Sequence, residues 1–205
     1  MLWFIVKGGP VMVPIIAASI LGLAIIMEKL WTFFSIRLDG ERFTEEILRL
    51  IRAGHFKEAL ALCAKHPHSP LAITLKAGIE RRDLTTHELE RHLERTGNIQ
   101  VKSLERYIGG LISVVGIEPL LGFLGTITGL IRAFMAWERA GSSVTVSMLA
   151  AGMYEAMITT AAGLIIAVPY YLVCNFIISR IKYVSYELSD SSMQLVEVLG
   201  EARKK

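Results

Sequence analysis

The chain is poor in cysteine and has no excess of charge of one sign, and both shortages exclude classes of protein. Only Cys63 and Cys174 are present, one in a polar region and one in an apolar run, so a disulfide framework is excluded. The polar stretch 28–106 carries 14 Lys and Arg against 12 Asp and Glu, so it lacks the basic face of a nucleic-acid-binding domain. We predict two inert thiols and a solvated helical bundle.

Catalytic motifs are missing as well. No nucleophile–base pair, phosphate-binding loop or cluster of metal ligands occurs at a useful spacing. The histidines are scattered: His66 and His68 flank a proline, and His87 and His92 lie on different faces of a helix. We therefore expect no enzyme, no metal and no cofactor.

Charge is nearly absent from three long apolar runs. Residues 10–27 carry no charge, 107–131 carry only Glu118, and 144–179 carry only Glu155. A membrane-spanning helix needs about 20 apolar residues, and the chain is 53% hydrophobic with a mean hydropathy of +0.48. The sequence predicts an all-α membrane protein with three transmembrane helices and long cytoplasmic helical extensions.

The ends of these runs predict how the chain is organised. The first run is followed by Glu28 and Lys29 without a cleavage site, so we expect a retained helix and not a signal peptide. The third run exceeds the roughly 30 Å of hydrocarbon, so Pro169 is expected to mark a bend or the membrane exit. The predicted parts are the N-terminal end with the first transmembrane helix (1–30), a cytoplasmic helical loop (31–106), the second and third transmembrane helices (107–180) and a cytoplasmic C-terminal helix (181–205).

Basic residues near the ends of the runs predict the orientation. The short loop between the second and third runs holds only Arg139, with Arg132 at the end of the second span, whereas the flanks after the first run, before the second and after the third each carry two or more Lys or Arg. The positive-inside rule then places the N-terminus outside and both the 28–106 loop and the C-terminus in the cytoplasm. The residues that decide this are Lys29, Arg37, Lys102, Arg106, Arg180 and Lys182.

Apolar spacing predicts the helices outside the membrane. Asp39 is expected to cap a helix that continues through residues 43–62 and ends at the His-Pro segment 66–70. A second helix, 71–104, is expected to run into the second span. The C-terminal residues 181–199 continue as an amphipathic helix.

Polar residues inside the second and third runs are the candidate ion pathway. A carboxylate in hydrocarbon costs several kcal/mol, so Glu155 is a functional hypothesis by default. Helical rise places Thr126 and Glu155 about 12 Å below the outer boundary, Thr160 about 20 Å and Glu118 about 24 Å. Thr159 shares a helical stripe with Glu155. A proton or small cation is expected to step along this ladder.

Each of these residues can also have a purely structural role. Glu155 can fix helix packing by bonding to a hydroxyl, and Thr126 and Thr160 can each bond to a carbonyl of their own helix. An acid at Glu118, directly before a proline, is easier to tolerate. Arg132 is expected to extend to the lipid headgroups. Small residues that we expect at helix contacts, together with the proline, are Gly122, Gly125, Gly129, Gly152, Gly163 and Pro169.

Two segments resemble a known family. Residues 119–131 read PLLGFLGTITGLI, residues 152–164 read GMYEAMITTAAGL, and AVP follows at 167–169. These motifs resemble those of the MotA/TolQ/ExbB proton-channel family, and the length and three spans resemble ExbB and TolQ more than MotA. By motif position, Glu155 matches the family glutamate, and Thr126 and Thr160 match its pore threonines.

The resemblance implies a subunit of a bacterial inner-membrane motor driven by the proton motive force. Such subunits form a pentamer around a dimer of a one-span partner, ExbD or TolR, whose intramembrane aspartate takes the proton, and they drive TonB or TolA. Glu118, Tyr154 and Arg132 depart from the family pattern, so proton and sodium both remain open as the ion. A flagellar or gliding stator and a non-conducting membrane scaffold are the alternatives.

Overall fold

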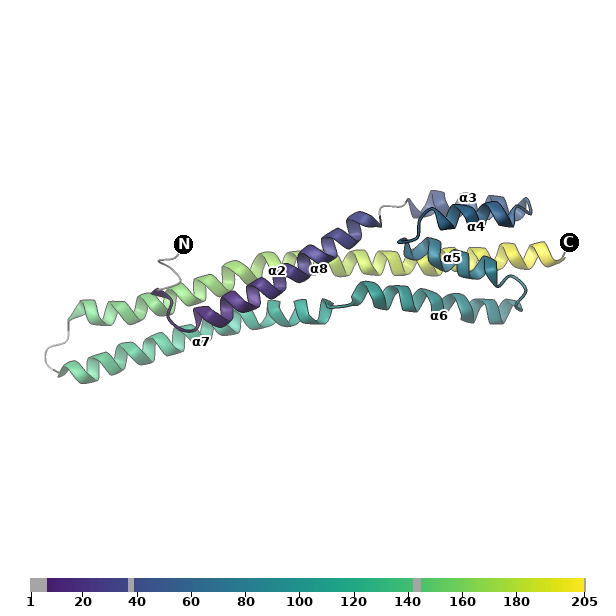
Figure 1. Ribbon diagram of the computed structural model, residues 1–205. Coiled ribbons are helices and arrows are strands. Elements are labelled where there is room, and N and C mark those ends of the chain that lie inside the picture. Colours follow the sequence, from purple (N-terminus) through teal and green to yellow (C-terminus); the bar gives the residue numbers. More distant parts are fainter. Residues whose placement is uncertain (1–6, 37–38, 142–144, 205) are drawn as a thin grey trace. The chain divides into compact units, whose positions relative to one another are not determined.

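Helices form the whole of the described structure apart from short connections. The computed structural model describes residues 7–36, 39–141 and 145–204, and Figure 1 shows its helices. They are α2 (Met12–Ser35), α3 (Gly40–Arg52), α4 (Phe56–Ala64), α5 (Pro70–Glu80), α6 (Thr86–Glu105), α7 (Ile108–Ala140) and α8 (Val146–Lys204).

The chain divides into two compact units. The first contains the chain up to Glu28 together with Tyr107–Phe176, and the second contains Lys29–Arg106 together with the chain from Ile177. Most of α2, all of α7 and the first half of α8 therefore build the first unit, whereas α3 to α6 and the second half of α8 build the other. We call them the apolar unit and the polar unit.

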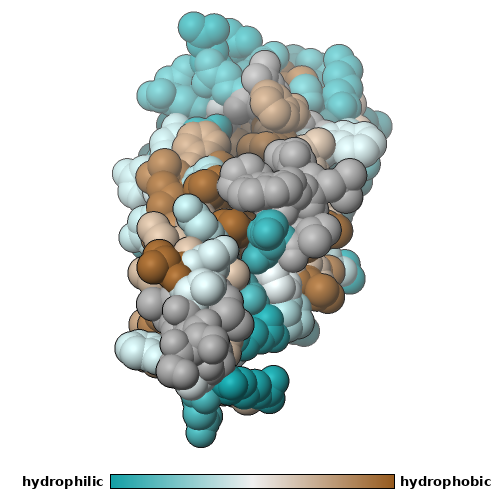
Figure 2. All heavy atoms as spheres, turned by 90° about the vertical axis from the view of Figure 1, so that its left-hand side faces the viewer, coloured by the Kyte–Doolittle hydropathy of each residue, from teal (hydrophilic) through white to brown (hydrophobic). Residues whose placement is uncertain are grey.

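The apolar unit has the surface of a membrane protein. Three helical stretches, within α2, α7 and α8, are long and apolar enough to cross a membrane. Large apolar side chains on these helices are exposed at the surface: Phe123 is 62% exposed, Ile165 72% and Leu172 63%. Figure 2 shows apolar residues in brown at the surface beside polar residues in teal. The predicted all-α class with three candidate spans is confirmed.

α2 packs against both other helices of the apolar unit. The hydroxyl of Tyr170 on α8 donates a hydrogen bond of 2.7 Å to the carbonyl oxygen of Ser19 on α2. A Cβ atom on Gly22 would lie 2.6 Å from the Tyr170 ring and 2.9 Å from the side chain of Val114 on α7. A glycine at this position therefore lets the three helices meet.

α8 continues well beyond the apolar run. It extends unbroken from Val146 to Lys204 with Pro169 inside it, so the proline does not end the helix. The predicted amphipathic C-terminal helix is confirmed, because its apolar face is buried. The residues of that face are Ile181, Val184, Leu188, Leu195 and Leu199. Val144, where the predicted third run begins, and Arg37 lie outside the described residues.

The polar unit has more helices than the sequence pattern predicted. The expected single helix 43–62 is wrong, because Gly54, at φ +81°, and His55 separate α3 from α4. The expected helix 71–104 is also two helices, since Thr85 and Glu88 form a capping box that begins α6. Tyr107, at φ +66°, then separates α6 from α7, so no continuous helix enters the second span.

Caps and buried side chains hold the polar unit together. Asp39 caps α3 as predicted, because its side chain accepts a hydrogen bond from the first turn of that helix. The hydroxyls of Thr44 on α3 and Ser191 on α8 are 2.9 Å apart and buried. Leu93 on α6 and Leu195 on α8 are also buried. These contacts fix the second half of α8 to the helices of the loop.

Burial predicts that Cys63 is unreactive in the folded protein. Its thiol is free, and burial raises its pKa to about 11. Because the thiolate is the nucleophile, alkylation by iodoacetamide at neutral pH is expected to be slow until the protein is denatured. Mass spectrometry of a Cys174→Ala variant, in which Cys63 is the remaining thiol, measures this rate. Equal rates before and after denaturation would contradict the burial.

Candidate functional site

α7 and α8 approach closely because glycines line both sides of their contact. A Cβ atom on Gly129 would lie 2.8 Å from the backbone nitrogen of Ala156 and 2.9 Å from the carbonyl oxygen of Gly152. A Cβ on Gly152 would in turn lie 2.7 Å from the Cβ of Ala133. Both positions therefore admit only glycine without a shift of the backbone, as in other close membrane-helix contacts.

The same contact continues along the two antiparallel helices. A Cβ on Gly122 would lie 3.2 Å from the Cα of Thr160, and a Cβ on Gly163 would lie 2.6 Å from the carbonyl oxygen of Glu118. A Cβ on Gly125 would overlap the side chain of Thr159 on α8. All five glycines singled out in the sequence thus lie between α7 and α8.

Two threonine hydroxyls meet at the centre of this contact. Oγ1 of Thr126 on α7 and Oγ1 of Thr160 on α8 are in hydrogen-bond contact. Thr160 also lies 3.0 Å from the carbonyl oxygen of Gly122, and Thr126 lies 3.4 Å from that of Ala156, so each hydroxyl reaches the opposite helix. The two hydroxyls and two carbonyls form a small polar cluster, which we call the threonine cluster.

Thr159 lies beside this cluster but bonds within its own helix. It is fully buried, and its side chain occupies the space left by Gly125. Its hydroxyl lies 2.9 Å from the carbonyl oxygen of Ala156 and 3.1 Å from that of Glu155. Thr159 therefore places a bonded hydroxyl between the threonine cluster and the backbone of Glu155.

Glu155 is paired with an arginine across the contact. Its Oε1 lies 2.5 Å from Nη1 of Arg132 on α7. The glutamate side chain is 15% exposed and the arginine side chain 48%. Arg132 was expected to extend to the lipid headgroups, and the structure adds a partner that the sequence did not predict, because a carboxylate on the neighbouring helix pairs with its guanidinium. A charge-assisted bond of this kind is stronger than a neutral one.

This pairing shifts the register expected for the ladder. Thr126 was expected at the level of Glu155, but it lies at the level of Thr160 instead. Glu155 lies at the level of Arg132, more than one turn further along α7. The expectation depended on where each span crosses the membrane boundary, whereas the glycine contacts set the true alignment.

The segment before α2 covers the ion pair. Gly9 has a φ of +67°, which favours glycine, and a Cβ there would overlap the Glu155 carboxylate and lie 3.2 Å from Nη1 of Arg132. Gly9 is not among the site residues that the sequence predicted. Only the Gly-Gly-Pro sequence at 8–10 signals an unusual backbone at this point.

Glu118 is a buried acid in the apolar unit. Its side chain is fully buried, and neither carboxylate oxygen has a hydrogen-bond partner among the residues that the structure describes. It lies on α7, directly before Pro119 and on the far side of the threonine cluster from Glu155. The structure thus gives the two acids of the apolar unit opposite surroundings.

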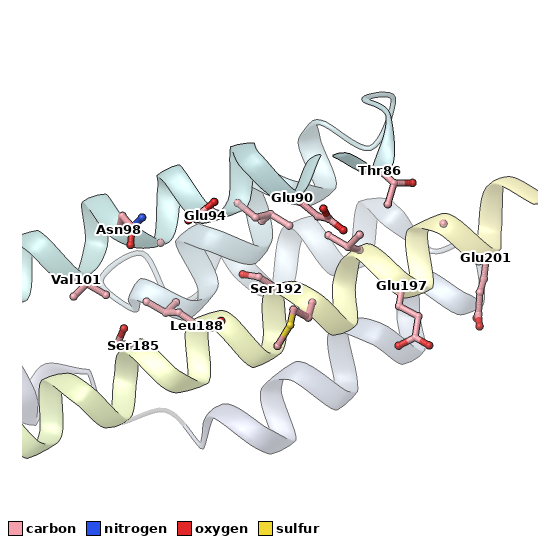
Figure 3. Close-up of a pocket in the computed structure, with 16 residues that line it drawn as sticks. Thr86, Glu90, Glu94, Asn98, Val101, Ser185, Leu188, Ser192, Glu197 and Glu201 are labelled. Carbon is pink, nitrogen blue, oxygen red and sulfur yellow. The ribbon is translucent and has the colours of Figure 1, made fainter. Parts of the chain in front are cut away.

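A groove in the polar unit contains none of these residues. It has a volume of about 1000 Å³ and lies between α6 and α8, with carboxylates and hydroxyls on both helices (Figure 3). Glu90 and Glu94 of α6 and Glu197 and Glu201 of α8 are among its lining side chains. Within residues 7–36, 39–141 and 145–204, no three His, Cys, Asp or Glu side chains are arranged to hold a metal ion.

Comparisons with known proteins point to one family. The profile of the MotA/TolQ/ExbB proton channel family matches residues 66–190. The ExbB-like 1 biopolymer transport protein of Synechocystis is 30% identical over 84% of this chain and 68% of its own. The Tol-Pal system protein TolQ of Haemophilus influenzae is 29% identical over the same shares. The biopolymer transport protein ExbB of Salmonella typhimurium is 27% identical over 91% of this chain and 79% of its own.

We predict that Gly129→Ala destabilises the apolar unit. The added methyl group would meet backbone atoms of α8 at 2.8–2.9 Å, and overpacking of this kind costs about 1–3 kcal/mol. Gly116→Ala is the matched control, because the same change on α7 meets nothing within 4 Å. Thermal unfolding in detergent should show a lower midpoint for Gly129→Ala only. Equal midpoints would contradict the close contact.

Proposed function

Because the chain belongs to the MotA/TolQ/ExbB proton channel family, we propose that it is an ExbB- or TolQ-like subunit of a motor in the inner membrane. The motor uses the proton motive force to do work at the outer membrane, through a TonB- or TolA-like protein that spans the periplasm. A one-span ExbD- or TolR-like protein with an intramembrane aspartate is its partner, and the subunit assembles as a homopentamer.

The observation that carries this proposal is the series of polar groups along the α7–α8 contact. Within an apolar unit, the Glu155–Arg132 pair, Thr159, the threonine cluster and Glu118 follow one another along the helices. Intramembrane carboxylates and hydroxyls mark ion pathways, because their burial is costly without a function. A proton or a small cation moves along this series together with the aspartate of the partner.

The partner aspartate supplies the moving charge. When it is protonated from the outer side, its attraction to the polar groups of one subunit weakens, and the partner can turn toward the next subunit. A membrane potential supplies about 2.3 kcal/mol per charge per 100 mV, which is enough to bias such a step. The basic flanks of the spans orient the subunit with its N-terminus outside and its polar unit in the cytoplasm.

A non-conducting scaffold is the second candidate, and one observation favours it. Thr159 donates to carbonyls of its own helix, and both Thr126 and Thr160 also lie within 3.4 Å of a carbonyl one turn earlier. Hydroxyls satisfied in this way stabilise helix packing without an ion. The two functions differ in whether loss of Glu155 stops ion flow.

We predict that Glu155→Gln stops ion flux without preventing assembly. The substitution removes the charge that an ion or the partner must meet, while it keeps the shape of the side chain. Flux is measured in vesicles that contain the subunit and its ExbD- or TolR-like partner, under proton and sodium gradients, beside Glu155→Gln/Arg132→Gln. The double variant is needed because a lone Arg132 charge can itself disturb folding.

A matched pair of threonine variants tests the pathway further. Thr126→Val removes a hydroxyl of the threonine cluster, whereas Thr128→Val removes a hydroxyl that bonds to Gly125 of its own helix. Flux should fall in Thr126→Val and persist in Thr128→Val. Undiminished flux in Glu155→Gln, with the complex intact, would reject the channel and favour the scaffold.

A further inference from the structure

The two acids of the apolar unit have different electrostatic surroundings. Glu155 lies 2.5 Å from a guanidinium, so its carboxylate charge is balanced by Arg132. Glu118 is fully buried, and both of its oxygens lack a hydrogen-bond partner in the described part of the chain. Two carboxyl groups in such contrasting sites take different protonation states and different roles.

Helices cover Glu118 on more than one side. Its carbonyl oxygen would lie 2.6 Å from a Cβ placed on Gly163, so α8 passes close to the backbone of Glu118. One turn earlier on α7, Val114 meets α2 at Gly22. Glu118 therefore lies on the buried stripe of α7, which also contains the fully buried Leu111.

The covering helices bring no charge to balance a Glu118 carboxylate. α2 carries no charged residue from Met12 to Met27, and the apolar part of α8 carries only Glu155, which is itself an acid. On α7, the described charge nearest in sequence on the outer side is Arg132, and it is paired. Tyr170 is the titratable side chain of α8 near this level, and its hydroxyl donates to Ser19.

An ionised carboxyl in this setting is costly. An isolated charge without a partner in an apolar interior costs several kcal/mol or more, and such a group becomes neutral instead. The backbone adds a polar break at the same place, since Pro119 has no N–H and the carbonyl of Val115 loses its usual helical partner. A neutral carboxylic acid avoids the cost of a buried, unbalanced charge.

We propose that Glu118 is a neutral carboxylic acid in this arrangement and is the group of this subunit that takes up and releases the proton, whereas Glu155 is a fixed anion held by Arg132. In uptake, the Glu118 carboxylate takes a proton from a hydronium ion that enters along the polar series, so an O–H bond forms on Glu118 as one O–H bond of the hydronium breaks and leaves water. In release, the O–H bond on Glu118 breaks, its proton goes to water on the cytoplasmic side, and the carboxylate is restored. The inference rests on the proposed function and deepens it, because it names the proton-exchanging side chain.

Infrared spectroscopy of the protein in lipid tests this directly. A protonated carboxylic acid gives a carbonyl stretch separate from carboxylate bands, and the stretch shifts when H₂O is replaced by D₂O. Wild type at neutral pH should show this band, Glu118→Gln should lose it, and Glu155→Gln should keep it. Glu118→Asp should retain the band at a shifted position, which shows that the loss in Glu118→Gln does not come from misfolding.

The outcomes separate the inference from the proposed function. Loss of the band in Glu155→Gln, or its absence in wild type, would overturn the assignment of the proton to Glu118 even if the vesicles conduct ions. Proton flux with the partner should also be lost in Glu118→Gln, and persistent flux in that variant would overturn its role in proton exchange. A third outcome is also possible: the infrared band depends on Glu118, but vesicles with the wild-type subunit and its partner conduct no ions. This result would reject the channel function and, with it, proton exchange by Glu118.

Discussion

The close approach of α7 and α8 is the constraint on which the apolar unit depends. Glycines at 129 and 152 leave room only for backbone against backbone, with a Cβ on either meeting atoms at 2.7–2.9 Å. Apolar burial gives little driving force between helices in lipid, so tight packing and interhelical polar contacts must hold them together. The same proximity lets Thr126 reach Thr160 and Arg132 reach Glu155. Packing and polar chemistry therefore have one cause in this unit.

Alignment of the two helices then assigns each acid its surroundings. Because the glycine contacts fix the register, Glu155 faces a cation, whereas neither oxygen of the buried Glu118 has a hydrogen-bond partner among the described residues. A shift of one turn would separate Glu155 from Arg132. Arg132 and Glu118 are thus linked through one alignment, since it gives Glu155 a charged partner and leaves Glu118 with no hydrogen-bond partner among the described residues.

Much of this arrangement follows from the sequence. Uncharged runs identify the three candidate spans, and the spacing of Gly122, Gly125 and Gly129 identifies one face of α7. Local signals also predict the Asp39 cap. These features depend on composition and on neighbours within one helix, which a single sequence records well.

Features that depend on the alignment of separate helices cannot be predicted from the sequence. The Arg132–Glu155 pair requires the register between α7 and α8, which the span boundaries give only to within a turn or more. The break at Tyr107 has a positive φ in a residue that rarely adopts one, so no local signal marks it. Glu118 is completely buried because several neighbouring helices cover it together. The adjacent Pro119 gives no signal in the sequence that this burial occurs.

The threonine cluster tests the register of α7 and α8 most directly. In a variant with Cys63 and Cys174 replaced by alanine, mild oxidation of Thr126→Cys/Thr160→Cys in native membranes should form a disulfide within one chain, measured by mass spectrometry. The pair Thr128→Cys/Thr160→Cys should not cross-link, because residue 128 lies on a different face of α7 from residue 126. Equal cross-linking of both pairs, or none at 126 and 160, would contradict the alignment on which the account depends.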